Sequence, residues 1–269
     1  MKITANAKDI LNVIKPILAY DNRKPPKGKS YYNEDKYGHD VRIKFDKNLI
    51  EMRSVDPARV SMMRIVTNIK ASVKDGYVKK YKLDKKEEEH VFNITKLANI
   101  LTAIGNKDVT LETKGRNLII ETDDLTQMTP MSIEDPNYPK VPVITVPATW
   151  DVSVASLKKK INYMMRIADY VRMKYDKGLV SYETKDRFKN EDEGRNCMVF
   201  VDAVEHKPFD GDDKPYTSLF QSDYLKSIIQ YVTSPTVTLH IGNDLPLRVT
   251  YSLKNTDFEI LLAPRIEHD

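Results

Sequence analysis

The sequence repeats itself, and this repetition constrains the fold more than any other feature. Residues 41–50 (VRIKFDKNLI) match residues 171–180 (VRMKYDKGLV) at an offset of 130 positions. A second match pairs the apolar segments of residues 109–120 with those of residues 237–249 at an offset of 128 positions. Because two separate segments share nearly one offset, we expect the chain to contain two similar halves.

Each half carries the same local pattern. Val41, Ile43 and Phe45 alternate with charged residues, which is typical of a half-buried strand, and the matching segment of the second half alternates in the same way. The turn-forming residues of 46–48 and 176–178 follow and predict one hairpin in each half.

Apolar residues at helical spacing predict two further elements in each half. The expected helices cover residues 7–18, 95–104, 157–168 and 222–232. Pro16 should end the first helix near Lys15, and Gly105 should end the second. In the third helix, Lys159 and Arg166 fall on the polar face. Strands and helices together predict an α+β chain.

Prolines gather between the halves, at positions 130, 136, 139, 142 and 147. This composition predicts a stiff, extended connector. We therefore expect an N-terminal domain of residues 1–132, a connector of residues 133–147 and a C-terminal domain of residues 148–269. Residues 21–40 and 203–217 lack a periodic pattern and predict long surface loops.

Composition excludes several classes of protein. The chain has 269 residues, of which 41% are hydrophobic and 30% charged, and no run approaches the roughly 18 apolar residues of a membrane span. The start of the chain lacks the order of a secretory signal, and Cys197 is the only cysteine. These features predict an intracellular, reducing compartment and no association with a membrane. The net charge of +4 is too small to decide the partner.

The reactive constellations of common enzymes are missing. No Gly-x-Gly pair exists for a dinucleotide loop, and the five histidines are scattered. Residues 210–213 resemble the start of a calcium loop, but Gln221 stands where the loop needs Glu. Residues 87–89 are consecutive glutamates, best interpreted as a charged surface turn. We predict a binding or scaffolding protein, not an enzyme, with no metal and no cofactor.

Several segments carry a family signature. Residues 244–251 (DLPLRVTY), 262–267 (LAPRIE) and 54–64 (SVDPARVSMMR) resemble segments of the sliding clamp called proliferating cell nuclear antigen, in its archaeal and eukaryotic form. Residues 92–106 and 224–239 fit the same family in the expected order. The chain resembles a divergent archaeal or viral member.

The resemblance implies a fold and a function. Clamps of this family are built from two tandem similar domains, and three subunits close head to tail into a ring. Helices line the inside of the ring and antiparallel sheets form its outside. The expected protein is a homotrimer that encircles duplex DNA independently of sequence and acts as a DNA polymerase processivity factor. It also serves as a docking platform for replication and repair enzymes, in the cytoplasm of an archaeal cell or a virus-infected host.

The resemblance also assigns three sets of residues. The expected DNA-binding residues are Lys15, Lys96, Lys158, Lys159, Arg166 and Lys226. The edge strands that join subunits lie near residues 126–132 and 196–202, and the expected interface residues are Gln127, Met128, Met131, Cys197, Val199 and Val201. The expected partners are a clamp loader and PIP-box-like peptides of the polymerase, the ligase and nucleases. The pocket expected to bind these peptides is lined by Val55, Arg59, Val60, Met62, Ile133, Val141, Pro246, Leu261, Ala263, Pro264 and Ile266.

Two alternatives stay open at this point. The chain could be one subunit of a heterotrimeric or checkpoint-type clamp, which would not assemble alone. It could also be a metal-dependent nuclease that uses the acidic residues of 87–89 or 210–213.

Overall fold

The computed structural model divides the chain into two compact units. It describes residues 1–20, 40–56, 58–132, 139–185, 198–204 and 215–266. The first unit comprises Met1–Val55, Met63–Val141 and Ser252–Phe258, and the second comprises Asp56–Met62, Pro142–Tyr251 and Glu259–Asp269. The longest segments of the two units meet between Val141 and Pro142, inside the predicted connector. The domain limits at residues 132 and 148 stay a prediction.

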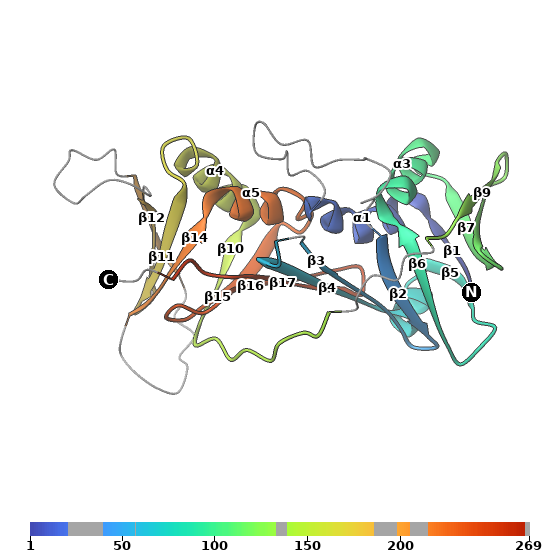
Figure 1. Cartoon of the computed structure of the whole chain (residues 1–269), viewed down its shortest axis with the longest axis horizontal. Coiled ribbons are helices and arrows are strands. Elements are labelled where there is room, and N and C mark those ends of the chain that lie inside the picture. The colour runs from blue at the N-terminus through green and yellow to red at the C-terminus, as the bar shows by residue number, and fades with distance from the viewer. Residues whose placement is uncertain (21–39, 57, 133–138, 186–197, 205–214, 267–269) are drawn as a thin grey trace. The chain divides into compact units, whose positions relative to one another are not determined.

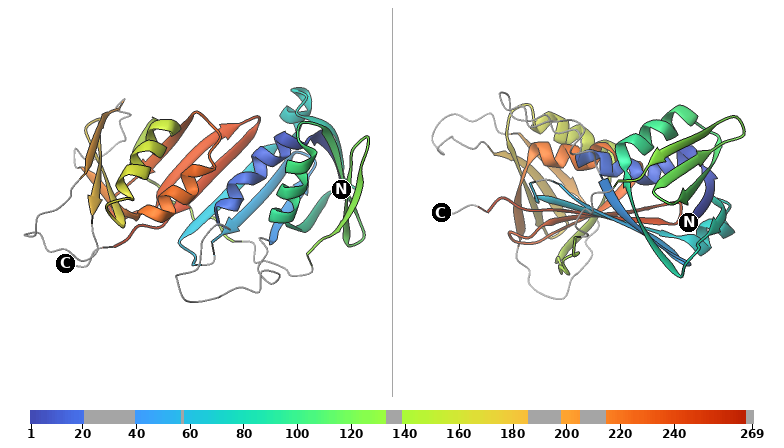
Figure 2. Two further views of the ribbon diagram at one scale, coloured as in Figure 1. Left: turned by 90° about the horizontal axis from the view of Figure 1, so that it is seen from above. Right: turned by 45° about the vertical axis from the view of Figure 1, so that its right-hand side comes forward.

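The first unit contains two sheets and a pair of neighbouring helices (Figure 1). One sheet has the strand order β5-β1-β7-β8-β9, and the other contains β4, β3, β2 and β6 in that order. Helices α1 and α3 lie side by side (Figure 2). The elements are β1 (Lys2–Asn6), α1 (Ala7–Ile14), η1 (Lys15–Tyr20), β2 (Asp40–Asp46), β3 (Leu49–Val55), β4 (Ser61–Asn68), α2 (Ile69–Lys74), β5 (Val78–Lys82), β6 (Glu87–Asn93), α3 (Ile94–Ile104), β7 (Asp108–Lys114), β8 (Asn117–Glu121) and β9 (Thr126–Pro130).

The second unit repeats this plan. Its strands are ordered β10-β15-β16-β17 and β13-β12-β11-β14, and helices α4 and α5 lie side by side (Figure 2). The elements are β10 (Ala148–Ser153), α4 (Val154–Met164), β11 (Tyr170–Asp176), β12 (Leu179–Lys185), β13 (Val199–Ala203), β14 (Tyr216–Gln221), α5 (Ser222–Gln230), β15 (Thr236–Ile241), β16 (Leu247–Leu253) and β17 (Thr256–Leu262). β10 thus corresponds to β1, β13 to β4 and β17 to β9, so the predicted duplication is confirmed.

The matched hairpins show the duplication residue by residue. β2 and β11 have the same alternation of buried and half-buried positions, and so do β3 and β12. Ile43 pairs with Met52 in the first hairpin, and Met173 pairs with Tyr182 in the second. All four side chains are buried, with at most 5% exposed. One face of each hairpin therefore contributes to the core of its unit.

The predicted helix ends are confirmed where proline or glycine sets them. α1 ends at Ile14, and a 3-10 turn begins at Lys15, because Pro16 has no backbone N–H to continue the helix. Gly105 caps α3 at a φ of 75°, and its N–H donates to the Leu101 carbonyl over 3.0 Å. The Asn93 side chain accepts the N–H of Lys96 at the other end of α3.

Several predicted limits were wrong by a few residues. Asp40 belongs to β2 because it pairs with Asn93, and Tyr216 belongs to β14 because it pairs with Tyr175. α4 ends at Met164 and α5 at Gln230, four and two residues earlier than their apolar spacing indicated. Residues at the ends of strands and helices show no hydrophobic periodicity, because pairing with distant segments decides where each element ends. The remainder of the two predicted loops lies outside the described residues.

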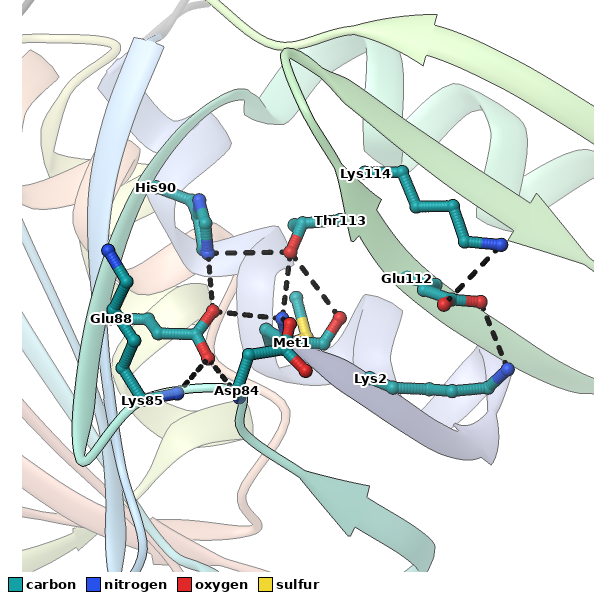
Figure 3. A network of polar contacts seen from close by, with 9 residues as sticks. All are labelled: Met1, Lys2, Asp84, Lys85, Glu88, His90, Glu112, Thr113 and Lys114. Atoms are coloured by element: carbon teal, nitrogen blue, oxygen red, sulfur yellow. Dashed lines mark hydrogen bonds and ion pairs between the residues drawn. The ribbon is translucent and has the colours of Figure 1, made fainter.

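A buried polar network stands where the sequence indicated a charged surface turn (Figure 3). Residues 87–89 are part of strand β6, so that interpretation was wrong. The ammonium group of Met1 donates to Glu88 over 2.8 Å, to Thr113 over 2.9 Å and to Asp84 over 3.2 Å. The side chains of Met1 and Glu88 are only 2% and 7% exposed. A buried charge pair therefore joins β6 to the start of the first unit.

This network controls the ionisation of Glu88. Burial by itself would raise the pKa of its carboxyl group. Hydrogen bonds from the ammonium group, from His90 and from the backbone N–H groups of Asp84 and Lys85 outweigh burial and lower the pKa to about 2. A carboxyl group with a lowered folded-state pKa stabilises the fold above its unfolded pKa. This contribution is lost as the pH falls from about 4.5 toward about 2.

We expect Glu88→Gln to lower the free energy of unfolding at pH 7 by about 3 kcal/mol, because the Met1 ammonium group would stay buried without its charged partner. Urea denaturation at pH 7 and at pH 2 measures the effect, and the difference from the wild type should shrink at pH 2. Glu87→Gln, which changes an exposed neighbour on the same strand, is the matched control. An equal loss from both variants would contradict this account.

Candidate nucleic-acid and partner interfaces

The polar faces of the four long helices carry exposed cations. Five of the six predicted DNA-binding residues are exposed to solvent, one or two on each helix or at its end: Lys15, Lys96, Lys159, Arg166 and Lys226. Their neighbours at core spacing on α4, among them Leu157, Ile161 and Met164, are buried. The amphipathic pattern therefore leaves each cation free to meet an anionic surface. Their role in binding DNA stays a prediction.

Two of the predicted residues have partners within the chain. The Lys158 ammonium group donates to the Val232 carbonyl over 3.1 Å, so this half-buried lysine stabilises the contact of α4 with the end of α5. The Arg166 guanidinium lies 5.8 Å from the centre of the Tyr163 ring, and Tyr163 is 42% exposed. A cation over an aromatic face is held in place without losing its charge. Arg166 is therefore held in position while its charge stays available, whereas the ammonium group of Lys158 is already engaged within the chain.

Sequence reasoning missed Lys160. Its ammonium group pairs with the Asp202 carboxylate of β13 and lies 5.1 Å from the centre of the Tyr182 ring. The Lys160 side chain is 11% exposed. The signal was present, because Lys160 follows Leu157 by three positions and falls on the buried face of α4. This pair ties α4 to an edge strand of the second unit.

Of the six strands that end a sheet in the described part of the chain, two expose large apolar side chains. β9 is the last strand of its sheet and pairs only with β8, while β13 pairs only with β12. Large apolar side chains stand exposed on both, with Met128 at 62%, Val199 at 49% and Val201 at 62%. Gln127 and Met131 are half-buried, and Cys197 lies outside the described residues. Such edges are ready to pair with another chain.

The segment between β3 and β4 forms a tight turn in the second unit. The buried Asp56 carboxylate accepts the backbone N–H of Ala58 over 3.0 Å and that of Ser61, and the Asp56 carbonyl accepts the N–H of Arg59 over 2.8 Å. Arg59 adopts a φ of 57°, which is unfavourable for a residue with a Cβ atom. Three hydrogen bonds to one residue hold this conformation, which leaves the Arg59 side chain exposed.

The C-terminal tail lies beside this turn. The N–H of Ala263 donates to the Val60 carbonyl over 2.8 Å, and the Ser61 hydroxyl donates to the Leu261 carbonyl over 3.0 Å. These bonds bring together two of the segments expected to form the peptide pocket.

The predicted pocket residues differ in how much side chain they offer. Leu261 is buried, with 7% exposed, whereas Ile266 is 54% exposed. The other described members are half-buried or exposed, and Ile133 lies outside the described residues: Val55, Arg59, Val60, Met62, Val141, Pro246, Ala263 and Pro264. Leu261 therefore packs in the interior and offers little side-chain surface to a ligand. The peptide pocket stays a prediction.

The described residues hold no group of three or more His, Cys, Asp or Glu side chains placed to bind a metal ion. Residues 210–213, the other acidic cluster, lie outside that part of the chain. None of the helices that the structure describes is long and apolar enough to cross a membrane.

Comparisons with known proteins agree on one class. No family model matches the sequence. The DNA polymerase sliding clamp of Methanosarcina barkeri is 28% identical over 240 residues, which are 86% of this chain and 91% of the relative. That of Archaeoglobus fulgidus is 26% identical over 243 residues, with the same two coverages.

Solved structures share the fold over the whole chain. The PCNA of A. fulgidus, solved with the C-terminal region of FEN-1 bound, has a TM-score of 0.77 at 22% identity and covers 100% of this chain and 99% of its own. The proliferating cell nuclear antigen of Entamoeba histolytica has a TM-score of 0.75 at 15% identity and covers 98% of both chains. The two-unit fold with its paired helices is that of a DNA clamp. Over most of its length the chain is similar to archaeal DNA polymerase sliding clamps, and it has the fold of the proliferating cell nuclear antigen structures.

We expect Asp202→Asn to lower the free energy of unfolding by about 2 kcal/mol, because it leaves the nearly buried Lys160 ammonium group without a charged partner. Lys160→Met removes the charge and keeps the stem, so its effect should stay within about 1 kcal/mol. Thermal unfolding measures both variants. Asp169→Asn, at an exposed position of the same unit, is the control. A larger loss from Lys160→Met than from Asp202→Asn would contradict this assignment.

Proposed function

We propose that this protein is a DNA polymerase sliding clamp that closes as a homotrimer around duplex DNA. One observation carries the proposal: of the six strands that end a sheet in the described part of the chain, only β9 and β13, one in each unit, expose large apolar side chains. A chain with two different apolar edges can pair head to tail with further copies, and a closed ring covers both of these edges.

The duplication supports pairing of β9 with β13. β17 corresponds to β9, and β4 corresponds to β13. Hydrogen bonds already join these counterparts within each unit, through Ala263 and Val60 in the second and through the hydroxyls of Thr67 and Thr256, 2.9 Å apart, in the first. Pairing between copies would repeat a contact that the chain makes within itself. It would also cover the apolar side chains of Met128, Val199 and Val201.

The helices provide the surface for DNA. The exposed cations of α1, α3, α4 and α5 can contact phosphates without reading bases, so a ring can slide along any sequence. The remaining part of the proposal is docking. Peptides of polymerases, ligases and nucleases would bind beside the turn of residues 56–61 and the tail of residues 259–266, while a clamp loader would open the ring. No catalytic group is required, because a tether acts by raising the local concentration of the enzyme.

The clamp would work where replication takes place. We propose that it is a DNA-associated protein in the cytoplasm of an archaeal cell or of a virus-infected host.

The edges predict the effect of a charge on assembly. The wild type alone should have a mass near 93 kDa by light scattering at micromolar concentration, which is three times its own 31.0 kDa. Val201→Glu on β13 and Met128→Glu on β9 should each give a folded 31 kDa monomer, because a buried carboxylate at the joint would lack a partner. Val73→Glu, at an exposed apolar residue of α2, is the control and should stay a trimer.

A wild type that stays monomeric at all concentrations would contradict the homotrimer. A trimer that appears only after a second kind of subunit is added would favour the heterotrimeric clamp.

The helix faces predict a salt dependence. A Lys159→Glu, Arg166→Glu double variant should weaken binding to duplex DNA and reduce the slope of log K against log salt by about 2 per subunit engaged, because two phosphate contacts are lost. Fluorescence anisotropy with a labelled duplex measures both quantities. Lys80→Glu, Lys82→Glu changes the same charge on strand β5 and should leave the slope unchanged. Equal slopes for the two double variants would contradict the assignment of α4 to the DNA surface.

A further inference from the structure

The first unit encloses an apolar cavity of about 110 Å³. Most of its lining is buried aliphatic and aromatic side chains: Ile3, Ile14, Phe45, Met52, Leu97 and Leu111. Protein interiors are normally packed without voids larger than a water molecule. An engineered cavity of about 150 Å³ with a similar lining stays dry and binds benzene. This cavity is somewhat smaller, so a molecule with a single ring fits if the lining side chains shift slightly.

One polar side chain in the lining lacks a partner. Ser72 of α2 is 1% exposed, and its hydroxyl group has no hydrogen-bond partner among the described residues. A buried hydroxyl without a partner destabilises the folded state. The hydroxyls of Thr67 and Thr256, which also line the cavity, bond each other. Ser72 is thus a polar group left for a ligand to satisfy.

Water is a poor occupant of this space. An ordered internal water needs two to four polar partners, and the lining is overwhelmingly apolar. A ligand with an apolar body and one hydrogen-bonding group matches both the shape of the space and the free hydroxyl of Ser72.

The side of the cavity that meets solvent is closed by polar contacts. Lys254 pairs with Asp9 of α1 over 2.5 Å, and its ammonium group lies 5.0 Å from the centre of the Tyr77 ring. All three residues line the cavity. They are exposed or half-buried, whereas the aliphatic and aromatic residues of the lining named above are buried. An exposed ion pair contributes little stability, so a ligand can displace it at small cost. Lys254 therefore marks the entrance.

We propose that this cavity is a binding site for a small apolar molecule with one hydrogen-bonding group, such as a phenol or a short alcohol. The apolar body fills the space among Ile3, Phe45 and Leu111, and the polar group bonds the Ser72 hydroxyl. The site is separate from the edges, the helix cations and the tail that serve as a clamp.

Phenol and benzene are the matched probes, because they differ by one hydroxyl group. Titration of the full chain, followed through the methyl resonances of Met52 and the lining isoleucines, gives an affinity for each probe. In the wild type both should bind. Ser72→Ala should lower the ratio of phenol to benzene affinity about fivefold, since one neutral hydrogen bond is lost. It should also raise the melting temperature of the free protein. Ser227→Ala on α5, whose hydroxyl donates to the Asp223 carbonyl, is the control for the ratio.

A second variant tests the space itself. Ala5→Val places two more carbons into the lining and should weaken both probes at least tenfold with their ratio unchanged. Lining methyl groups that do not respond to either probe would overturn the proposal. A phenol-to-benzene ratio that is the same in the wild type and in Ser72→Ala would overturn the role of Ser72.

Discussion

Backbone hydrogen bonding at the ends of sheets is the constraint on which the rest of this structure depends. Every strand carries donors and acceptors on both sides, and a strand with one neighbour leaves half of them for solvent or for another chain. Within the chain, the segments around Val60 and Ala263 satisfy each other in this way. β9 and β13, their counterparts in the duplicated plan, have a strand neighbour on one side only among the described residues. The proposed assembly of copies follows from these two edges, because each lacks a second strand.

The two units place these edges by the same means. Alternating side chains fix the faces of the hairpins, so one face of each joins a core and the other meets water. Helix pairs then pack their apolar faces and keep their cations outside. β13 has an additional contact, because the ion pair of Lys160 with Asp202 fixes this strand to α4. A buried ion pair is weak evidence for stability, but it favours one position of the strand.

Much of this was predictable from the sequence. The repeat, the hairpins, the end of α1 at Pro16 and the cap at Gly105 follow from local periodicity and backbone chemistry, and the structure confirms them. The identity of the family rested on short motifs near the turn and the tail, and the relatives bear it out.

The rest depends on contacts between residues far apart in the chain. The burial of Glu88 depends on the Met1 ammonium group, 87 positions away, so consecutive glutamates looked like a surface turn. Spacing alone places Lys160 on the buried face of α4, but the partners that receive its charge, Asp202 and Tyr182, lie far from it in the sequence. The left-handed Arg59 depends on hydrogen bonds to Asp56, a constraint that no residue preference indicates. Patterns of neighbouring residues cannot predict contacts between residues that are far apart in the sequence.

The central claim is that the closed ring is linked to DNA by topology. The most direct measurement uses a linear duplex with one end fixed to a bead, onto which the protein is threaded before the free end is capped with a bulky bound protein. Retention in high salt is then followed before and after a restriction enzyme cuts the duplex. The account predicts that the protein stays on the capped duplex, because salt weakens contacts and not topology, and leaves once the DNA is cut. Loss in high salt from the capped duplex, or retention after the cut, would contradict it.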